Sequence, residues 1–309
     1  MSFIMAGEGG GNIVWFTYTG ADGEVIDDEA THIFVKARVI RRRAFYDHPN
    51  IVEVICDENV EKIERWAFSW CRSLRRVIMR GVKIVQESAF CNCRALKEVE
   101  CDKLEIVKHF AFQLCTSLRR INLPSARIVR KGAFDCCSLT DVKFGNKLER
   151  IEEMAFCRCE SLERITIPLK DGLIASDKTF VGCYNLRQVD LVDGELHKTI
   201  AALHLREWRH DMNQEIASIN QILPSAAAGR WVNNFEEPDP GEKAEAVRRW
   251  IRSVLDKIIH YQAEHRHLLD DAATSLEVVL PNNDIVMNNV IPFLQLPSYT
   301  FYVNEEEGG

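Results

Sequence analysis

The chain has 309 residues, of which 46% are hydrophobic and 28% charged. These proportions are ordinary for a globular protein and exclude a collagen-like, low-complexity or largely disordered chain. The formal net charge of −7 does not suit a surface built throughout to bind nucleic acid. No run of 18 apolar residues is present that predicts a transmembrane helix.

The N-terminal segment divides into a tail and a cap. Residues 1–11 are rich in glycine and are predicted to be flexible. Residues 12–37 contain two apolar segments, 13–18 and 32–36, on either side of the turn sequence Gly20-Ala-Asp-Gly23. This pattern predicts a β-hairpin that caps the repeats that follow.

Residues 38–191 contain a tandem repeat with a period of 22 to 24 residues. Each of its seven copies carries an Ala-Phe or Thr-Phe pair, and six carry a cysteine three residues after the phenylalanine. The two columns are Phe45, Phe68, Phe90, Phe112, Phe134, Phe156 and Phe180, and Cys71, Cys93, Cys115, Cys137, Cys159 and Cys183. His48 takes the place of the cysteine in the first copy.

Polar and apolar residues alternate from six to eleven residues after each phenylalanine, as in Leu118–Leu123, which predicts one short strand per copy. A copy of 22 residues cannot bury its apolar face alone. The copies are therefore predicted to stack into an α/β repeat solenoid of about seven turns, with the phenylalanine and cysteine columns inside.

The consensus Ile-x3-Ala-Phe-x2-Cys-x2-Leu-x2-Ile-x-Leu-Pro, seen at 107–124 and 151–168, resembles the BspA-type leucine-rich repeat. The resemblance covers about half of the chain and implies a leucine-rich-repeat solenoid. The sequences Asn220-Gln-Ile-Leu-Pro-Ser and Trp250-Ile-Arg-Ser-Val-Leu are similar to the tails of an expanded set of such proteins in unicellular algae. For that set the resemblance implies no established activity and no catalytic residues.

Residues 192–303 are predicted to form a helical C-terminal module. Apolar residues recur every three to five positions over 196–223, which predicts an amphipathic helix that ends at Pro224. The other predicted elements are a loop over 225–241, a second long helix over 247–261, a short helical segment over 276–280, another after Asp284 and a disordered acidic tail over 304–309.

All eleven cysteines lie within residues 56–183, at repeated positions. This placement predicts buried structural thiols, because free cysteine behaves as a small hydrophobic residue. Zinc needs four converging ligands, and this chain offers the pairs Cys91/Cys93, Cys157/Cys159 and Cys136/Cys137 instead of two CxxC motifs. Column cysteines point in parallel, which disfavours disulfides. No metal and no cofactor are predicted.

No P-loop, HExxH, Gly-x-Ser-x-Gly or dinucleotide fingerprint is present, so no enzymatic activity and no catalytic residue are predicted. One set of side chains offers an alternative. His260, Glu264 and His267 share a face of the second predicted helix at spacings that suit metal ligands, although a solvated helix face has the same pattern.

The outward residues of the predicted strands form the natural binding surface of a solenoid. Charge alternates along one column, from Glu53 through Arg76, Glu98, Arg120 and Asp141 to Arg164, so neighbouring copies are expected to pair and to neutralise this face. The predicted binding residues are Arg75, Arg76, Ile78, Lys97, Glu98, Glu100, Arg119, Arg120, Asn122, Asp141, Lys143, Arg164, Thr166 and Arg187.

Residues 41–191 carry an excess of Lys and Arg, and the rest of the chain an excess of Asp and Glu. This asymmetry suits an acidic partner, or docking of the acidic tail on the solenoid. Interspersed acidic residues would interrupt a stripe that tracks phosphates, which favours a protein over nucleic acid. Neither a membrane nor a particular oligomeric state is indicated.

Three observations predict a cytoplasmic or nuclear location: reduced cysteines, no export signal and no Asn-x-Ser/Thr sequon. We therefore predict a non-catalytic, intracellular protein-interaction scaffold that uses the strand face of its solenoid. The alternative is a secreted or surface adhesin that binds glycans, and it requires oxidised cysteines. An enzyme with a pocket lined by the residues of the second helix is a third possibility.

Overall fold

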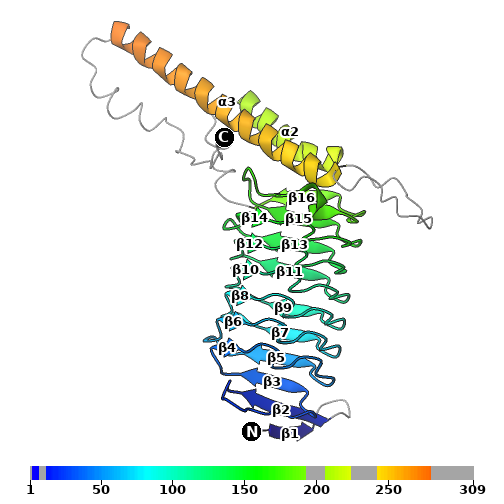
Figure 1. Cartoon of the computed structure of the whole chain (residues 1–309). Coiled ribbons are helices and arrows are strands. Elements are labelled where there is room, and N and C mark those ends of the chain that lie inside the picture. Colours follow the sequence, from blue (N-terminus) through cyan, green and yellow to red (C-terminus); the bar gives the residue numbers. More distant parts are fainter. Residues whose placement is uncertain (1, 7–11, 193–205, 224–241, 280–309) are drawn as a thin grey trace, which may run out of the picture. The chain divides into compact units, whose positions relative to one another are not determined.

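The computed structural model describes residues 2–6, 12–192, 206–223 and 242–279 (Figure 1). The chain divides into two compact units. The first contains nearly all of the solenoid up to residue 192, and the second contains α2 (Arg206–Ile222) and most of α3 (Glu242–Val279). We describe each unit by itself.

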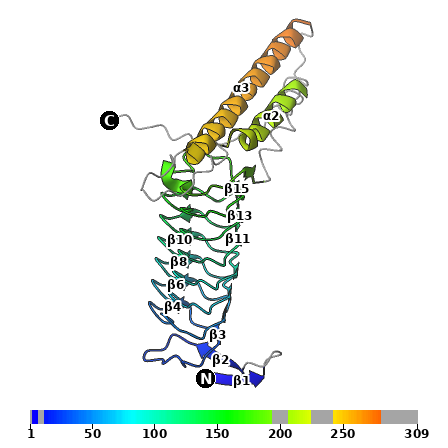
Figure 2. The same cartoon turned by 90° about the vertical axis from the view of Figure 1, so that its right-hand side faces the viewer.

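The solenoid is a stack of rungs with two walls of strands, and each of the first six sequence repeats contributes one strand to each wall (Figures 1 and 2). The first wall contains β2 (Asn12–Tyr18), β3 (His32–Val35), β5 (Glu53–Cys56), β7 (Arg76–Ile78), β9 (Glu98–Glu100), β11 (Arg120–Leu123), β13 (Asp141–Phe144), β15 (Arg164–Ile167) and β16 (Gln188–Leu191). The second contains β4 (Val39–Ile40), β6 (Lys62–Ile63), β8 (Ile84–Val85), β10 (Ile106–Val107), β12 (Ile128–Val129) and β14 (Arg150–Ile151).

Neighbouring rungs pair in parallel and in register. Val54 lies opposite Val77, and Val77 opposite Val99, so one repeat position forms one column along the stack. The solenoid of parallel strands is therefore confirmed. The last rung is two residues longer and contains the short helix η1 (Asp177–Phe180), and Ile174 takes the pairing position next to Ile151.

The seven phenylalanine rings form a continuous stack inside the solenoid. Each ring is at most 2% exposed, adjacent centroids are 4.9 to 5.9 Å apart, and the ring planes differ by 3 to 15°. Tyr18 extends the stack at its N-terminal end by an edge-on contact with Phe45. Burying one such ring contributes roughly 2 to 3 kcal/mol, so this column is a main support of the fold.

The cysteine column satisfies backbone carbonyls beside the phenylalanines. Each of the six thiols donates to the carbonyl of the phenylalanine one rung earlier, over 2.9 to 3.3 Å, as Cys71 does to Phe45. His48, in place of the first cysteine, contacts the carbonyl of Asp27 through Nε2. All eleven cysteines are free. The thiols therefore give these buried carbonyls a second donor, beside the backbone N–H three residues after each phenylalanine, as His48 N–H bonds the Phe45 carbonyl.

Each rung reverses direction around its phenylalanine through residues in the left-handed region. Positions two before and two after the phenylalanine have φ near +60°, as at Trp66 (+58°), Trp70 (+69°) and Leu114 (+60°). Few of these residues are glycine, and a non-glycine residue there costs on the order of 1 kcal/mol. Backbone bonds between rungs, such as that from Trp70 N–H to the Cys91 carbonyl, hold the turns. We call the surface formed by these turns the turn face.

The N-terminal cap differs from the prediction. Residues 32–35 pair with residues 15–18 in parallel, so 12–37 do not form a hairpin. Instead β2 and β3 are the first two strands of the solenoid wall, and the residues between them make the connection of a rung. The antiparallel hairpin consists of β1 (Ser2–Ala6) and β2, so residues 2–6, predicted to be flexible, form its outer strand.

The two helices of the second unit are antiparallel. Trp250 Nε1 donates to the Glu215 carbonyl, and Trp208 stacks on Tyr261 with centroids 5.1 Å apart. Asp211 accepts hydrogen bonds from the Tyr261 hydroxyl and from Lys257, and these bonds lower the pKa of its carboxyl. Within the described residues, neither helix has a stretch apolar and long enough to span a bilayer.

Helix α3 has 38 residues and is longer than the predicted 247–261. Residues 276–279 continue it and do not form a separate segment, because residues 242–279 contain no proline or glycine. The predicted start of the first helix, the loop 225–241, the helix after Asp284 and the tail 304–309 lie outside the described residues.

We expect Phe112→Ala to lower the free energy of unfolding by about 3 to 5 kcal/mol, because it leaves a cavity in the middle of the ring stack. Urea denaturation followed by circular dichroism measures the change. Arg120→Ala, on the outside of the neighbouring strand, should change it by less than about 0.5 kcal/mol. A loss below about 1 kcal/mol for Phe112→Ala would contradict a supporting role for the stack.

The cysteine column predicts a loss of stability at alkaline pH. Burial raises the pKa of Cys71 to about 12, and that of Cys93 well above 9.0. The folded state thus binds these protons more tightly than the unfolded state, so the stabilisation is complete below pH 9 and is lost as the pH rises toward 12. Urea midpoints measured from pH 8 to 10.5 should fall.

The double variant Cys93→Ala/Cys159→Ala distinguishes the thiols from other groups that titrate between pH 8 and 10.5, because it removes two thiols and leaves the other groups in place. Each thiol removed should reduce the slope of unfolding free energy against pH by up to about 1.4 kcal/mol per pH unit. Equal slopes for the variant and the natural protein would show that the column does not titrate as we expect.

Candidate functional site

The candidate site is the outer surface of the first wall, which we call the strand face. Along the strands, residues eight and ten positions after the phenylalanine point outward and alternate with inward residues, as in the exposed-buried alternation of β11; in the fifth copy, which is one residue shorter here, the outward positions are seven and nine. The predicted binding residues on these strands occupy such positions: Asn122 and Lys143 are exposed, and Thr166 is half-buried. The face runs the length of the stack.

On the first rungs the charges of this face neutralise one another. Arg76 on β7 contacts carboxylates of both neighbouring rungs, Glu53 on β5 (3.3 Å) and Glu98 (3.2 Å) and Glu100 (2.8 Å) on β9. Hydrogen bonds from Arg80 and Arg76 lower the pKa of Glu100. The expected pairing across the ladder is therefore present here.

Next to this network lies an apolar stripe that the sequence reasoning recognised only in part. Phe34, Ile55 and Ile78 are in register on β3, β5 and β7, and each is half-buried. Only Ile78 was among the predicted binding residues. Phe34 was missed because its strand was assigned to a hairpin. The repeat pattern did place Ile55 at an outward position, but Ile55 was not among the predicted binding residues.

The wall is divided between β9 and β11. One sheet ends at β9 and another begins at β11, while the opposite wall continues through β8, β10 and β12. Elsewhere the residue seven after the phenylalanine donates to its counterpart one rung earlier, as Lys97 N–H does to the Arg75 carbonyl. Both Lys97 and Arg119 lie in the described part of the chain, and no such bond joins them. The Cys101 thiol spans this seam, at 3.5 Å from the Asn122 carbonyl.

Beyond the seam the face is polar and hollowed. A depression of about 670 Å³ is lined by Arg120, Thr140, Asp141, Glu163, Arg164, Asn185, Arg187 and Gln188. Arg164 bonds Gln188 (2.8 Å) and lies 3.5 Å from Asp190, so its guanidinium is directed to the next rung. Among the residues that the structure describes, the buried Oδ1 of Asp141 has no hydrogen-bond partner.

The expected pairing of Asp141 with the arginines on either side is wrong. Neither Arg120 nor Arg164 lies within 4.0 Å of its carboxylate in the described chain. Alternation of charge along the sequence places these groups in neighbouring rungs, but side-chain rotamers decide which atoms meet. Within the described residues, the depression therefore presents the unpaired guanidinium groups of Arg120 and Arg187, whereas Arg164 pairs with Asp190 and the Oδ1 of Asp141 is buried.

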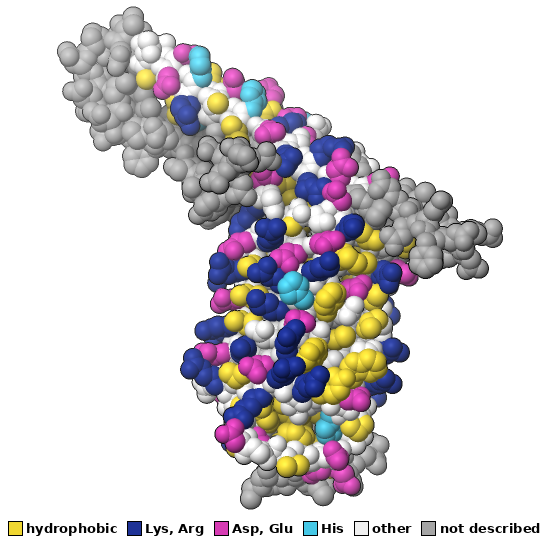
Figure 3. Space-filling view, in the orientation of Figure 1, with side chains coloured by type: hydrophobic (Ala, Val, Ile, Leu, Met, Phe, Trp, Pro, Cys, Tyr) yellow, Lys and Arg dark blue, Asp and Glu magenta, His cyan; other side chains and the backbone are white. Residues whose placement is uncertain are grey.

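The basic column beside the strands is available to a partner. Arg75, Lys97, Arg119 and Arg187 are exposed, and among the residues the structure places none has a carboxylate within 4 Å. Figure 3 shows one side of the solenoid, where Lys and Arg alternate with Asp and Glu and hydrophobic side chains gather in a band along the stack.

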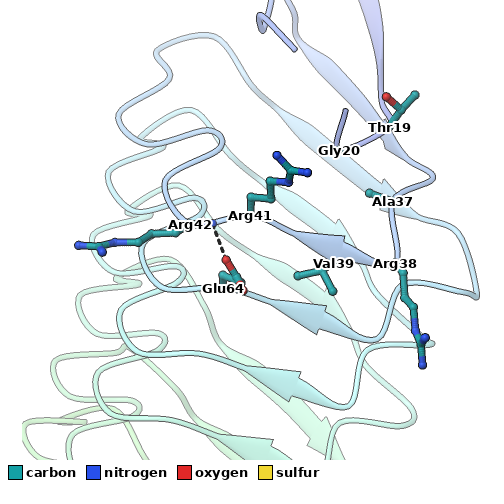
Figure 4. Close-up of a pocket in the computed structure, with 8 residues that line it drawn as sticks. All are labelled: Thr19, Gly20, Ala37, Arg38, Val39, Arg41, Arg42 and Glu64. Atoms are coloured by element: carbon teal, nitrogen blue, oxygen red, sulfur yellow. Dashed lines mark hydrogen bonds between the residues drawn. The ribbon is translucent and has the colours of Figure 1, made fainter. Parts of the chain in front are cut away.

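A second cavity, of about 620 Å³, lies beside β4 and is lined by Thr19, Gly20, Ala37, Arg38, Val39, Arg41, Arg42 and Glu64 (Figure 4). Two of its three arginines are paired with carboxylates. Arg38 pairs with Glu61 at 2.8 Å, Arg41 pairs with Asp22, and Glu64 accepts a hydrogen bond from the Arg42 backbone. The Arg42 side chain extends away from Val39 and Ala37.

The residues considered for catalysis or metal binding are not assembled into a site. In the described ranges, no three His, Cys, Asp or Glu side chains are grouped to hold a metal ion. On α3, His267 lies 3.0 Å from Asp271. The half-buried Cys136 is a poor nucleophile, because burial raises its pKa to about 11.

A solenoid of parallel strands with one repeat per rung and a regular outward face defines a leucine-rich-repeat protein. The model of the BspA type leucine rich repeat region matches residues 38–129 and 83–200, in six copies, which together cover more than half of the chain. The protein therefore belongs to the BspA-type leucine-rich-repeat family.

Solved structures with a similar repeat region are known, and no curated protein sequence matches the chain. The pneumococcal vaccine antigen PcpA is 19% identical over 57% of this chain and 54% of its own, with a TM-score of 0.40. The T. pallidum leucine-rich-repeat protein TpLRR is 20% identical over 62% and 89%, with a TM-score of 0.37. A leucine-rich-repeat protein from Bacteroides ovatus is 16% identical over 62% and 75%, with a TM-score of 0.28. The chain spans about half the length of the pneumococcal antigen.

The seam predicts locally fast hydrogen exchange. We expect the Arg119 amide to exchange faster than the equivalent amides of Lys97 and Thr140, which donate to the carbonyls of Arg75 (2.8 Å) and Arg119 (2.7 Å). Exchange resolved by NMR or by mass spectrometry of overlapping peptides measures the three rates. Equal protection of all three amides would mean that the wall is continuous.

Proposed function

We propose that this protein is a non-catalytic binding protein that holds a protein partner on its strand face, inside the cell. The observation that carries the proposal is the combination on this face of an apolar stripe, Phe34, Ile55 and Ile78, with exposed cations that have no partner in the described solenoid. Protein interfaces characteristically combine an apolar centre with a polar and charged rim.

The rigidity of the face supports the same role. Its outward side chains are positioned by a backbone that is hydrogen-bonded between rungs over most of the stack. A surface that is ordered before binding loses little conformational entropy when a partner docks. The rung repeat also gives the face an extended length, which suits a macromolecule better than a small substrate.

A protein fits this face better than a nucleic acid. Glu53, Glu98 and Glu100 lie among its cations and would repel a phosphate backbone. A phosphate backbone also offers no apolar surface that could pack against the half-buried Phe34, Ile55 and Ile78.

The cysteine column supports a reducing compartment. Each of its six thiols acts as a hydrogen-bond donor to a buried carbonyl, and only the reduced form carries that proton. A count of free thiols in the denatured, unreduced protein from its natural source tests this point. Eleven thiols are expected, and a markedly lower count would favour a secreted or surface role.

Affinity purification under reducing conditions tests the binding face. The double variant Arg120→Glu/Arg164→Glu reverses two charges on the strand face, and Lys147→Glu/Arg150→Glu reverses two exposed charges outside it. We expect mass spectrometry to identify a protein that the natural chain and the second variant retain and that the first variant loses. Circular dichroism should show that both variants remain folded. Identical sets of proteins for all three chains, or turnover of a metabolite by the purified protein, would defeat the proposal.

A further inference from the structure

The turn face of the first two rungs carries a cluster of aromatic and arginine side chains that the strand-face proposal does not use. We call it the aromatic–arginine patch, and its members are Arg42, Arg43, Tyr46, Trp66, Trp70 and Arg72. Its aromatic rings are accessible: Tyr46 is 46% and Trp70 37% exposed. None of these residues was predicted from the sequence to bind a ligand.

The arginines of the patch stack on its aromatic rings. The guanidinium carbons of Arg42 and Arg43 each lie 4.8 Å from the centroid of Trp66, and Arg43 lies 5.6 Å from that of Tyr46. Arg72 lies 4.9 Å from the centroid of Trp70. These distances are within the range of attractive cation–π contacts.

The repeat geometry brings these groups together. Arg43 and Trp66 occupy the same position, two before the phenylalanine, in adjacent rungs, and both have φ of +58°. Phe45 N–H donates to the Ala67 carbonyl at 2.8 Å, which fixes the two turns side by side. The patch is therefore set by the backbone and does not need a ligand to form.

The charges of the patch are not neutralised by the protein itself. Arg65 also lies over Trp66, but it pairs with Glu87 at 2.6 Å. In the described part of the chain, no carboxylate lies within 4 Å of the side chains of Arg42, Arg43 or Arg72. Stacking occupies only the flat face of a guanidinium, so the N–H donors in its plane remain available to grip a carboxylate in a two-point contact.

We propose that the aromatic–arginine patch binds an acidic segment of a partner protein. Carboxylates of the segment bond to Arg42, Arg43 and Arg72, and its apolar side chains cover Tyr46 and Trp70. Tryptophan, tyrosine and arginine are the residue types that most often dominate the binding energy of protein interfaces. The inference goes beyond the proposed function, because it concerns a different surface and stands whether or not the strand face binds a protein.

The extent of the patch argues against a nucleic acid. At the position of Arg43 and Trp66, the next three rungs carry Ser88, Phe110 and Gly132; at the position of Arg72 they carry Arg94, Thr116 and Ser138, so the row of cations ends after one more rung. Exposed Asp47 lies on the same turns. A phosphate backbone would need cations that continue along the stack, whereas a short acidic segment does not.

Fluorescence anisotropy with the full reduced chain tests the proposal. The probe is a labelled short peptide that contains several glutamates and two leucines, and its partner probe has glutamine in place of every glutamate. We expect saturable binding of the glutamate peptide, about tenfold or more tighter than that of the glutamine peptide, and weaker at high salt. Arg42→Gln/Arg43→Gln should weaken binding by about tenfold or more, because it removes charged hydrogen-bond donors.

Two further variants separate the patch from general charge. Arg41→Gln removes a neighbouring guanidinium that pairs with Asp22, and it should leave the affinity unchanged. Arg43→Lys keeps the charge but loses the planar fork, and it should still weaken binding. Urea denaturation of each variant checks that the fold is intact.

The strand-face variant Arg120→Glu/Arg164→Glu should bind the glutamate peptide as the natural chain does. This separates failure of the patch from failure of the proposed function. The inference is overturned by equal binding of the two peptides, by no saturable binding at low salt, by an unchanged affinity of Arg42→Gln/Arg43→Gln, or by tighter binding of a short oligouridylate. Loss of peptide binding in the strand-face variant alone would also overturn it.

Discussion

The solenoid depends on the contact between one rung's phenylalanine and the next. A rung of about 22 residues has no core of its own, so its apolar residues are buried only by the rungs on either side. The cysteine thiol adds a second constraint, because it donates to the carbonyl of the phenylalanine one rung earlier and so matches the register of the rings. Ring stacking and carbonyl pairing thus act on the same backbone position. A rung that slipped by one residue would lose both.

This inner order decides where chemistry is possible. Buried thiols have raised pKa values and serve as hydrogen-bond donors, so the cysteines, which in the sequence look like a reactive set, are poor nucleophiles. Binding must therefore use the outward residues, on the strand face and on the turn face. Because equivalent positions of neighbouring rungs lie about 5 Å apart, each outward residue meets its own repeat counterparts first. The repeat itself builds the stripe from Phe34 to Ile78 and the patch around Trp66.

The buried phenylalanine and cysteine columns could be predicted from the sequence, because the same residue type at the same position of every repeat indicates the same buried environment. The strands before the first repeat could not, because this segment has no Ala-Phe pair: Tyr18 contacts Phe45 edge-on, and the parallel pairing of β2 with β3 leaves no local signal in the sequence. The left-handed turns could not be predicted from the sequence either, because residues such as Trp66 and Leu114 occupy the positions where a glycine would indicate such a turn. The seam between β9 and β11 has no signal either, because Lys97 and Arg119 both fit the repeat.

The alternation of polar and apolar residues predicted which positions of the candidate site lie on the strand face. It did not predict which of the charged side chains there are paired. Arg76 is held by three carboxylates, Arg120 by none in the described chain, and Arg42 rests on a tryptophan ring. All three count equally in a net charge. For a partner they differ, because a paired guanidinium must first give up its carboxylate, whereas a stacked one keeps its contact and offers its donors. The availability of the arginines, and not their number, therefore decides which surface of this solenoid can bind an acidic group.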